Sequence, residues 1–468
     1  MPAFALTEVM RATGGVACGR APELSLSGVS TDTRAIAPGS LFVALRGERF
    51  DAHDFLADAA RRGARAALVE RCIPPEQAGA LVQIRVADTR RALGELARFH
   101  ALRSPARRVA ITGSNGKTTT KDLLHAALSA GGTAVASERS YNNDVGLPLT
   151  LLQITPATAF AALELGTNHP GEIARLADLA RPHVGVVTNC AAAHVEFLGD
   201  LDGVAREKGA LIAALPPDGV AILNADDSKF EAIRARARCR VVTFGVRRTA
   251  DFTAVDIRFD LRRLVYKLRG RRVHVPLGGC HNVYNSLAAL AAADAVGVPL
   301  PAAIAALRHA HGPPMRLAVE LLGALTLIDD SYNANPGSVE AAFRTLAAAT
   351  VKARRVMVLG DMLELGAQAA AEHRRAGALA SLLGDALLIA VGPHARDVAG
   401  GALERGVDPG RIAVFDDADC AARAVPALLA PDDAVLVKGS RGMAMERVVE
   451  AIERAFARTA GTALAAGR

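Results

Sequence analysis

Short apolar segments alternate with helix-like segments along most of the chain. In the middle of the sequence, five apolar runs are separated by stretches in which apolar residues recur at helical spacing: VAIT, AFAALEL, HVGVVTN, GVAILN and RVVTFG. Strands that are apolar on both sides are typical of a parallel sheet covered by helices on both faces. The pattern therefore predicts an α/β fold.

This alternation changes at two places, which divides the chain into three predicted domains. Residues 1–84 contain the strand-like runs SLFVAL and AALVE and predict a small α/β domain. A connector helix over residues 85–104 leads into a central domain, residues 85–312, with a mainly parallel sheet and antiparallel-looking strands after residue 250. The two prolines of HGPPMR indicate the next boundary and a hinge, because proline is a poor helix residue. Residues 313–468 resume the alternation and predict a Rossmann-like C-terminal domain, although without a G-x-G-x-x-G loop.

Bulk properties agree with a multidomain protein in the cytoplasm. A chain of 468 residues exceeds the usual size of one domain. The first residues do not resemble a signal peptide, because Glu8 and Arg11 interrupt them. The most apolar stretch, residues 284–306, contains Asp294 and three helix breakers, and this predicts two short helices rather than a membrane span. We expect a cytoplasmic monomer that contacts no membrane.

Cysteine and charge patterns narrow the chemistry. The six cysteines occur singly, and we expect them to be small buried residues in a reducing compartment. The net charge of +7 could indicate nucleic acid, but tryptophan is absent and no basic run is interleaved with aromatics, so no nucleic-acid partner is expected. The most basic stretch, residues 262–272, predicts an exposed hairpin that turns at Gly270. Only seven of the 55 basic residues are lysines, so each lysine raises the question of why arginine does not serve there.

The run ITGSNGKTTT contains the clearest functional motif. A strand followed by G-x-x-G-K-T at the start of a helix gathers backbone N–H groups and the positive end of a helix dipole at one point, which suits phosphate. Lys117 would reach the terminal phosphates, and the Thr118 hydroxyl would ligate Mg²⁺. The common pattern has glycine five residues before Gly116, where this chain has Ile111. The loop is a variant, and it still predicts nucleotide binding.

Three further residues are candidates for metal or catalytic roles. Glu164 follows an apolar strand at the sheet edge where ligands bind, although such a residue is commonly a solvated cap. His194 follows another strand and could equally be a structural histidine. Lys208 could be a cation on a helix surface near Glu207. Periodicity does not decide the last two cases.

At this point a family resemblance becomes visible along almost the whole chain. The motifs STDTR, GERFDAHDF, TGSNGKTTTK, YNNDVGLPLTLL, ELGTNHPGEI, AAAHVEFLG, EKGALI, GGCHNVYNSLAALAA, DDSYNANPGS, VLGDMLELG and VKGSR resemble, in order, those of the Mur ligase family of bacterial cell-wall synthesis. YNNDVGLP, DDSYNANPGS and GDMLELG favour the member of the family that adds a dipeptide.

The resemblance implies an ATP-driven amide synthesis. UDP-N-acetylmuramoyl-tripeptide would supply a carboxylate, ATP would convert it to an acyl phosphate, and the amine of D-alanyl-D-alanine would attack. Phosphorylation is needed because a free carboxylate has no good leaving group. The protein's task would be positioning and stabilisation of negative charge, with the third domain closing to exclude water.

The resemblance also implies roles for individual residues. Lys117, His194 and Lys208 would be catalytic, with Lys208 carbamylated by CO₂ into a metal-ligating anion, which arginine could not become. Mg²⁺ would be held by Thr118, Glu164, His194 and carbamylated Lys208. The remaining assignments concern ATP and the substrates. ATP would be bound by Gly113, Ser114, Asn115, Gly116, Lys117, Thr118 and Thr119 at the phosphates, and by Asn282, Asn285, Arg316 and Asp330 around adenine, phosphate and ribose. The UDP-sugar would contact Thr31, Asp32, Thr33, Arg34, Asp51 and His53; the muramyl peptide Asn142 and Asn143; and the dipeptide carboxylate Ser440 and Arg441. For Ser440, an alternative role as a helix N-cap stays open.

Three alternatives remain. The first is a sibling ligase that adds a single amino acid, such as the one that builds the tripeptide; the absence of a D-N-P-R-like segment for a diamino acid argues against it. STDTR and YNNDVGLP argue against folylpolyglutamate synthase. The third alternative is an ATPase that only changes conformation on binding a partner.

Overall fold

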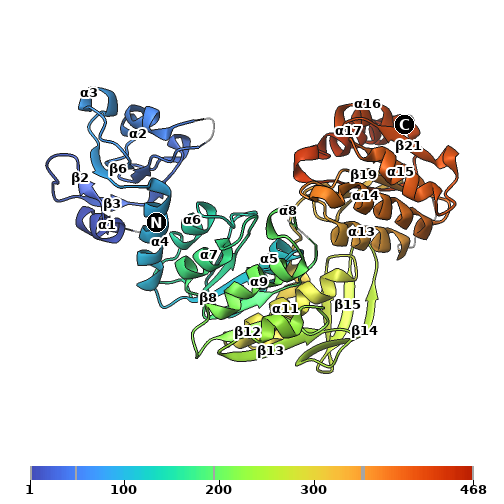
Figure 1. The fold of residues 1–468 in the computed structure, drawn as a ribbon, viewed down its shortest axis with the longest axis horizontal. Helices are drawn as coiled ribbons and strands as arrows, with labels where there is room; N and C mark the ends of the chain where they lie inside the picture. Colours follow the sequence, from blue (N-terminus) through green and yellow to red (C-terminus); the bar gives the residue numbers. More distant parts are fainter. Residues whose placement is uncertain (1–2, 48–49, 193–194, 349–353, 466–468) are drawn as a thin grey trace.

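The computed structural model describes residues 3–47, 50–192, 195–348 and 354–465, arranged as three α/β domains in a row (Figure 1). The first domain, in blue, and the third, in orange and red, lie at opposite ends of the green and yellow central domain. The predicted three-domain α/β class is confirmed. The predicted boundaries at residues 84 and 312 stay predictions.

The first domain is built on a five-stranded sheet in the order β2-β7-β6-β5-β4, in which only β2 is antiparallel to its neighbour. Its strands are β2 (Val16–Ala17), β4 (Val29–Ser30), β5 (Leu41–Val43), β6 (Ala66–Val69) and β7 (Val82–Arg85), beside a ribbon of β1 (Ala3–Ala5) and β3 (Ser25–Ser27). Its helices are α1 (Leu6–Thr13), η1 (Thr33–Ala35), η2 (Ala52–Phe55), α2 (Leu56–Arg61) and α3 (Pro75–Ala78). The predicted connector is α4 (Thr89–Leu102), which the Asp88 side chain caps.

A nine-stranded sheet forms the central domain, in the order β16-β15-β14-β13-β12-β11-β8-β10-β9. The strands from β9 to β14 are parallel, and β14, β15 and β16 are antiparallel, as the change of pattern predicts. The strands are β8 (Arg107–Thr112), β9 (Ala134–Ala136), β10 (Phe160–Glu164), β11 (Val184–Val187), β12 (Val220–Asn224), β13 (Arg240–Gly245), β14 (Phe252–Phe259), β15 (Leu264–Leu268) and β16 (Arg271–Val275). The helices are α5 (Lys117–Ser129), α6 (Gly146–Leu151), α7 (Glu172–Ala180), α8 (Val195–Leu198), α9 (Leu201–Ala213), α10 (Phe230–Arg234), α11 (His281–Ala295), α12 (Leu300–Ala306) and η3 (Leu307–His309).

Helices on both faces explain why the central strands are uniformly apolar. On β8, Val109 and Ile111 pack into the core with α5 and α11, whereas Ala110 faces the core that includes α4, α6, α7 and α9. Both faces of the strand are therefore buried against helices and shielded from solvent. The carboxyl ends of β8, β10 and β11 lie together at one edge, because these strands are parallel neighbours.

The C-terminal domain has a six-stranded sheet in the order β17-β18-β22-β19-β20-β21, parallel except for β17. Its strands are β17 (Ala318–Leu322), β18 (Leu325–Asp330), β19 (Arg355–Gly360), β20 (Leu387–Val391), β21 (Ile412–Phe415) and β22 (Ala434–Lys438). The helices are α13 (Pro336–Ala348), η4 (Gly366–Gln368), α14 (Ala369–Ala378), η5 (Leu379–Leu383), α15 (Ala395–Leu403), η6 (Pro409–Arg411), α16 (Ala418–Leu428), η7 (Arg441–Met443) and α17 (Glu446–Ala465). One core packs α13, α14 and α15 on one face of the sheet, and the other packs α16 and α17 on the opposite face.

The segment around HGPPMR has neither helix nor strand, in agreement with a connection between domains. Met315 and Leu317 both have left-handed backbones, with φ of 61° and 50°. The Leu317 N–H donates to Asp330 Oδ1 (3.2 Å), so the end of the connection is attached to β18.

The expectation of small buried cysteines is confirmed for Cys190 and is wrong for three others. Cys18 and Cys72 form a disulfide within the first domain, and Cys280 is exposed. The pairing is invisible in the sequence because 54 residues separate the two cysteines, and only the sheet brings the end of β2 beside the loop after β6. Among the described residues, no helix combines the length and apolarity needed to cross a membrane.

Candidate active site

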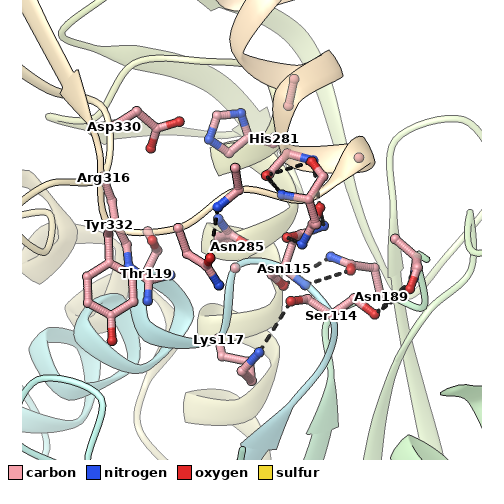
Figure 2. Close-up of a pocket in the computed structure, with 18 of the residues that line it drawn as sticks. Ser114, Asn115, Lys117, Thr119, Asn189, His281, Asn285, Arg316, Asp330 and Tyr332 are labelled. Atoms are coloured by element: carbon pink, nitrogen blue, oxygen red, sulfur yellow. Dashed lines mark hydrogen bonds between the residues drawn. The ribbon is translucent and has the colours of Figure 1, made fainter. Parts of the chain in front are cut away.

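A cleft of about 880 Å³ lies between the central and C-terminal domains. Its lining includes the loop after β8, the start of α11, the loop after β18 and the residues after β22 (Figure 2). Both sheets therefore present the carboxyl ends of parallel strands to one space, which is where α/β proteins bind ligands.

The loop between β8 and α5, residues 113–116, needs its glycines for two reasons. Gly113 and Gly116 have φ of 148° and 80°, which side-chain-bearing residues rarely adopt. A Cβ on Gly113 would also collide with the Thr188 hydroxyl, and one on Gly116 with the Asn285 side chain. The loop is thus packed tightly against β11 and α11.

Lys117 lies folded over this loop. Its Nζ donates to the carbonyl oxygens of Gly113 (2.7 Å) and Ser114 (3.2 Å). Burial lowers the pKa of Lys117 to about 8, while the negative charge of Glu164 acts in the opposite direction. The cation is therefore already held where phosphate oxygens would approach the loop.

Three buried oxygens around the loop lack a hydrogen-bond partner among the described residues: Thr112 Oγ1, Thr118 Oγ1 and Glu164 Oε2. Glu164 is only 1% exposed, which excludes the solvated-cap interpretation. Its other oxygen, Oε1, accepts a hydrogen bond from Asn142 Nδ2 (2.8 Å). Buried oxygens without partners are unfavourable unless a ligand satisfies them, and hydroxyl and carboxylate oxygens suit Mg²⁺. The pair Thr118 and Glu164 thus fits a magnesium ion, although no group of three or more His, Cys, Asp or Glu able to hold a metal occurs in the described part of the chain.

Lys208 lies on α9 and is 2% exposed, which excludes a helix-surface cation. Burial lowers the pKa of Lys208 to about 7, and the charge of Lys117 lowers it further. The adjacent Glu207 has a separate structural role, since its carboxylate accepts from the N–H groups of Gly171 and Ile173 at the start of α7 (both 2.7 Å). His194, the remaining metal candidate, lies outside the described residues.

The predicted nucleotide residues gather on the same cleft. Asn285 Nδ2 donates to Asn282 Oδ1 (2.8 Å), and the Thr120 hydroxyl donates to Asn285 Oδ1 (3.3 Å), which joins the start of α11 to α5. The Arg316 guanidinium lies over the ring of Tyr332, 4.3 Å from its centroid. Asn282, Asn285, Arg316 and Asp330 all line the cleft.

Lys438 is a cleft residue that the motif assignment did not include. It is 2% exposed, and its Nζ donates to Asp330 Oδ2 (2.7 Å) and to the Asn333 carbonyl (2.9 Å). The sequence feature that could have pointed to Lys438 is the scarcity of lysine, since the chain has only seven.

Ser440 and Arg441 line the cleft but are engaged within their own domain. The Ser440 hydroxyl accepts from the Leu363 N–H (2.9 Å) and donates to the Ala334 carbonyl (3.2 Å). Arg441 pairs with Glu446 (3.1 Å). Ser440 occupies the N-cap position of η7, as the alternative predicts, but its side chain makes no capping hydrogen bond.

The predicted UDP-sugar residues lie apart from this cleft, in the first domain. Asp32 pairs with Arg34 (2.7 Å), and Asp51 pairs with buried His53. Burial raises the pKa of Asp51, but the backbone N–H and side chain of His53, together with the Arg71 guanidinium, hold this pKa down at about 2. Of the two asparagines predicted to contact the muramyl peptide, Asn142 lines the cleft, whereas Asn143 Oδ1 accepts from the Val145 and Gly146 N–H groups at the start of α6.

The sequence-based assignment did not include two polar residues, one of which holds the phosphate loop and the other the segment after β9. Asn189, after β11, accepts from the Asn115 N–H (3.0 Å) and donates to the Asn115 carbonyl (3.1 Å). Lys121 on α5, 2% exposed, donates to the carbonyls of Ser137 (2.6 Å) and Arg139 (2.9 Å). The position of Asn189 directly after a predicted strand was a usable signal, whereas nothing in the sequence indicates the partners of Lys121.

Fold and cleft together define a three-domain nucleotide-dependent enzyme with a phosphate-binding loop. Family models match the chain in three successive stretches: Mur ligase family, catalytic domain, over residues 25–101; Mur ligase middle domain over residues 111–293; and Mur ligase, glutamate ligase domain, over residues 315–441. The chain belongs to the Mur ligase family.

Individual relatives match over nearly their whole length. The UDP-N-acetylmuramoyl-tripeptide–D-alanyl-D-alanine ligase of Escherichia coli (strain K12) is 41% identical over 444 residues, which is 92% of this chain and 94% of that protein. A crystal structure of MurF from Acinetobacter baumannii, 33% identical, superposes with a TM-score of 0.89 over 97% of this chain and 99% of that one. MurF ligase from Thermotoga maritima in complex with ADP is 25% identical, with a TM-score of 0.79 over 92% of this chain and 98% of that one.

Proposed function

We propose that the protein is the ATP-dependent ligase that joins D-alanyl-D-alanine to UDP-N-acetylmuramoyl-tripeptide, the final cytoplasmic step in making the nucleotide precursor of peptidoglycan. It would thereby serve cell-wall growth, cell shape and division. The observation that carries this proposal is the glycine loop with Lys117 and the unsatisfied oxygens of Thr118 and Glu164, placed opposite the C-terminal domain in a chain that matches such ligases end to end.

The reaction forms one amide bond for each ATP that is split. A carboxylate oxygen of the tripeptide attacks the γ-phosphorus, ADP leaves, and the resulting acyl phosphate has a good leaving group. The dipeptide amine then attacks the acyl carbon, and phosphate departs as the proton leaves the nitrogen. In this scheme the loop amides and Lys117 hold the transferring phosphoryl group and compensate its negative charge.

The residues around the loop fit a divalent cation. Mg²⁺ would be held by Thr118, Glu164, His194 and carbamylated Lys208, and it would supply positive charge that neutralises the phosphates. We propose further that Lys208 is carbamylated. A pKa of about 7 leaves a large neutral fraction at physiological pH, and only a neutral amine adds to CO₂.

We assign the other contacts as follows. Asn282, Asn285, Arg316 and Asp330 would surround the nucleoside, with an asparagine amide matching the adenine edge and a carboxylate accepting from ribose hydroxyls. Thr31, Asp32, Thr33, Arg34, Asp51 and His53 would bind the UDP-sugar, Asn142 and Asn143 the peptide, and Ser440 and Arg441 the dipeptide carboxylate. The half-exposed Arg441 guanidinium is the better placed of the last two, because the Ser440 hydroxyl already has two partners.

A turnover assay tests the proposal. We expect ADP release that requires both UDP-muramyl tripeptide and D-alanyl-D-alanine, with one new amide bond for each ADP. Hydrolysis of ATP that is independent of both compounds would instead support the alternative of a conformational ATPase.

A second experiment tests the carbamate. Lys208→Ala should lose activity, and added short carboxylic acids should restore part of it by supplying the missing anion. A mass spectrum of the native protein should show the 44 Da adduct at Lys208; an unmodified lysine in active protein would refute this assignment.

A further inference from the structure

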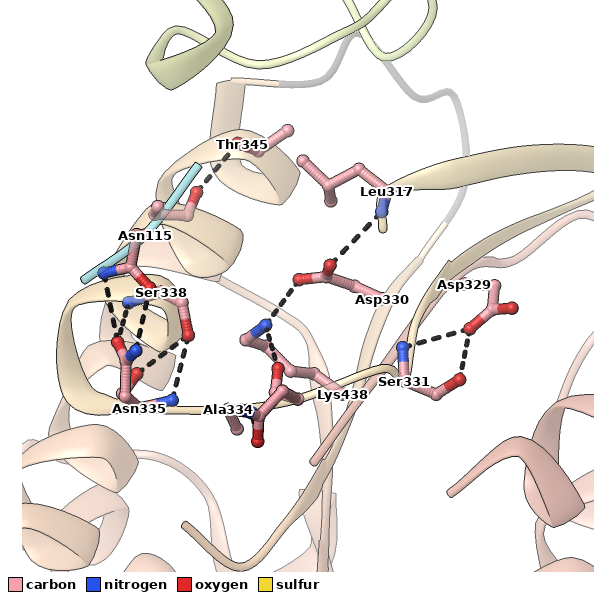
Figure 3. Close-up of polar contacts among 12 residues, drawn as sticks. Asn115, Leu317, Asp329, Asp330, Ser331, Ala334, Asn335, Ser338, Thr345 and Lys438 are labelled. Atoms are coloured by element: carbon pink, nitrogen blue, oxygen red, sulfur yellow. Dashed lines mark hydrogen bonds and ion pairs between the residues drawn. The ribbon is translucent and has the colours of Figure 1, made fainter. Parts of the chain in front are cut away.

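Two asparagine side chains connect the phosphate loop directly to the C-terminal domain (Figure 3). Asn335 Nδ2 donates to Asn115 Oδ1 (2.7 Å), and Asn115 Nδ2 donates back to Asn335 Oδ1 (3.3 Å). The two residues are 220 positions apart in sequence. This reciprocal pair, the Asn115–Asn335 bridge, crosses the cleft at the point where the loop approaches α13.

Asn115 is held by its backbone, so its side chain is free to face the other domain. Its N–H donates to Asn189 Oδ1 (3.0 Å), and its carbonyl accepts from the Thr188 hydroxyl (2.6 Å) and from Asn189 Nδ2 (3.1 Å). Every backbone polar group of this residue is thereby tied to the end of β11. The Asn115 side-chain amide therefore keeps a fixed position relative to the loop.

Asn335 is held equally firmly from its own side. Its Oδ1 accepts from the Ser338 N–H (2.9 Å), and its N–H donates to the Ser338 hydroxyl (2.9 Å), so it caps the start of α13. The preceding segment is fixed by Lys438, which donates to the Asn333 carbonyl, and by Ser440, which donates to the Ala334 carbonyl.

The first turn of α13 comes very close to the loop. A Cβ added at Gly337 would lie 3.4 Å from Asn115 Nδ2 and 3.5 Å from the Cβ of Ala191. A single added methyl group would therefore be enough to bring the start of α13 into van der Waals contact with two segments of the central domain. The bridge thus lies where the two domains approach each other closely.

We propose that Asn335 is a positioning residue, which through Asn115 sets the registration of the C-terminal domain on the phosphate loop during ligation. The inference rests on the proposed function. The acyl phosphate forms beside the loop, and the C-terminal domain brings the dipeptide amine. Water competes for the acyl phosphate whenever that domain is displaced. Two neutral hydrogen bonds are strong enough to bias closure and weak enough to open for product release.

The test separates the bridge from the helix cap. Asn335→Ser keeps a hydroxyl at the N-cap, where serine is as good as asparagine, but it is too short to reach Asn115. Ser338→Ala is the matched control, because it removes the hydroxyl from the cap and leaves both amides of the bridge. The measured quantity is the number of ADP molecules released for each peptide bond formed at saturating dipeptide.

We expect a ratio near one for the unmodified protein and for Ser338→Ala, and a ratio several-fold higher for Asn335→Ser, with affinity for ADP changed less than about twofold. Asn115→Ser, which breaks the bridge from the other side, should raise the ratio as well, and the double variant should be no worse than the more affected single variant. An unchanged ratio in Asn335→Ser, or an equal rise in Ser338→Ala, would overturn the proposal.

Small-angle X-ray scattering with Mg-ADP provides a readout that does not depend on ligation. The bridge predicts a larger radius of gyration for Asn335→Ser than for Ser338→Ala. If the unmodified protein hydrolyses ATP but makes no peptide bond, the proposed function fails, and the scattering comparison alone decides whether the bridge holds the domains together.

Discussion

The two walls of the cleft differ in whether their buried polar groups have hydrogen-bond partners within the protein. On the central-domain side, Thr118 Oγ1 and Glu164 Oε2 have no partner among the described residues, and Lys208 is buried with a pKa of about 7. On the C-terminal side, Lys438 is paired with Asp330, and the Ser440 hydroxyl both donates and accepts. These groups of the central wall thus lack partners in the described chain, whereas Lys438 and Ser440 are satisfied within the C-terminal domain.

The difference separates two tasks. Unsatisfied groups lower stability and are kept where a ligand must be bound strongly, whereas internally satisfied groups give a rigid surface that can be moved as one piece. We therefore expect substitutions on the central wall to affect activity more than stability, and substitutions on the C-terminal wall to affect stability strongly.

Lys117→Ala should give the largest effect. Removing the cation from the loop should lower kcat by about a thousandfold or more, because the loop amides would then face the transferring negative charge without the Lys117 ammonium. The fold should persist, since the Lys117 bonds are confined to two loop carbonyls. Steady-state ADP release and a circular dichroism melt check the two parts; an active variant would remove Lys117 from the phosphate site.

Lys438→Met should destabilise the C-terminal wall of the cleft. It leaves Asp330 without its buried cation and should lower the free energy of unfolding by about 3 kcal/mol, measured by urea denaturation. Adding Asp330→Asn should recover part of this loss. Lys267→Met is the control, because its ion pair with Asp256 is exposed and its removal should leave stability unchanged. Equal effects of the two lysine variants would contradict the contrast between the walls.

Glu164→Gln should move stability and activity in opposite directions. The amide keeps an oxygen for Asn142 but removes a buried charge, so the ligand-free protein should gain about 1 kcal/mol while kcat falls about a hundredfold. Thermal melts with and without Mg-ATP measure both consequences. A clear loss of stability would instead mean that the Glu164 carboxylate stabilises the ligand-free protein, as the paired groups of the C-terminal wall do.

The pH dependence of Lys208 should give the smallest change. Burial depresses its pKa to about 7, so the neutral fraction rises from about one tenth at pH 6 to about nine tenths at pH 8. Carbamate formation at constant dissolved CO₂ should rise across the same interval, as ¹³C NMR with labelled CO₂ would show. A Lys208→Ala spectrum identifies the signal, and a signal that does not change with pH would contradict the prediction.

The sequence predicted features that depend on local chemistry. The parallel strands followed from their uniform apolarity, and the phosphate loop from glycines and Lys117 at a strand-to-helix junction. Scarcity of lysine pointed toward positions where arginine would not serve. Lys121, Lys208 and Lys438 are each 2% exposed, and Lys117 donates to two carbonyls of the phosphate loop.

Features that depend on where whole domains lie could not be predicted. The Asn115–Asn335 bridge joins two loops whose separation is set by the connection at residues 310–317, and no local pattern encodes that placement. The Cys18–Cys72 bond lies within one domain, and it was hidden because only the pairing of β2, β7 and β6 brings the two cysteines together. The sequence also did not indicate that the Asn143 side chain accepts hydrogen bonds at the start of α6, because a capping asparagine and a ligand-binding asparagine look alike in the sequence.

The bond between Cys18 and Cys72 has a practical consequence for anyone who purifies this enzyme. Closing a loop across 54 residues restricts the unfolded chain and stabilises the first domain by about 4 kcal/mol on the chain-entropy account. Dithiothreitol in the buffer would therefore yield a preparation whose first domain melts earlier than that of an air-oxidised sample. Substrate affinities measured in different laboratories are therefore comparable only if the reducing agent in the buffer is stated.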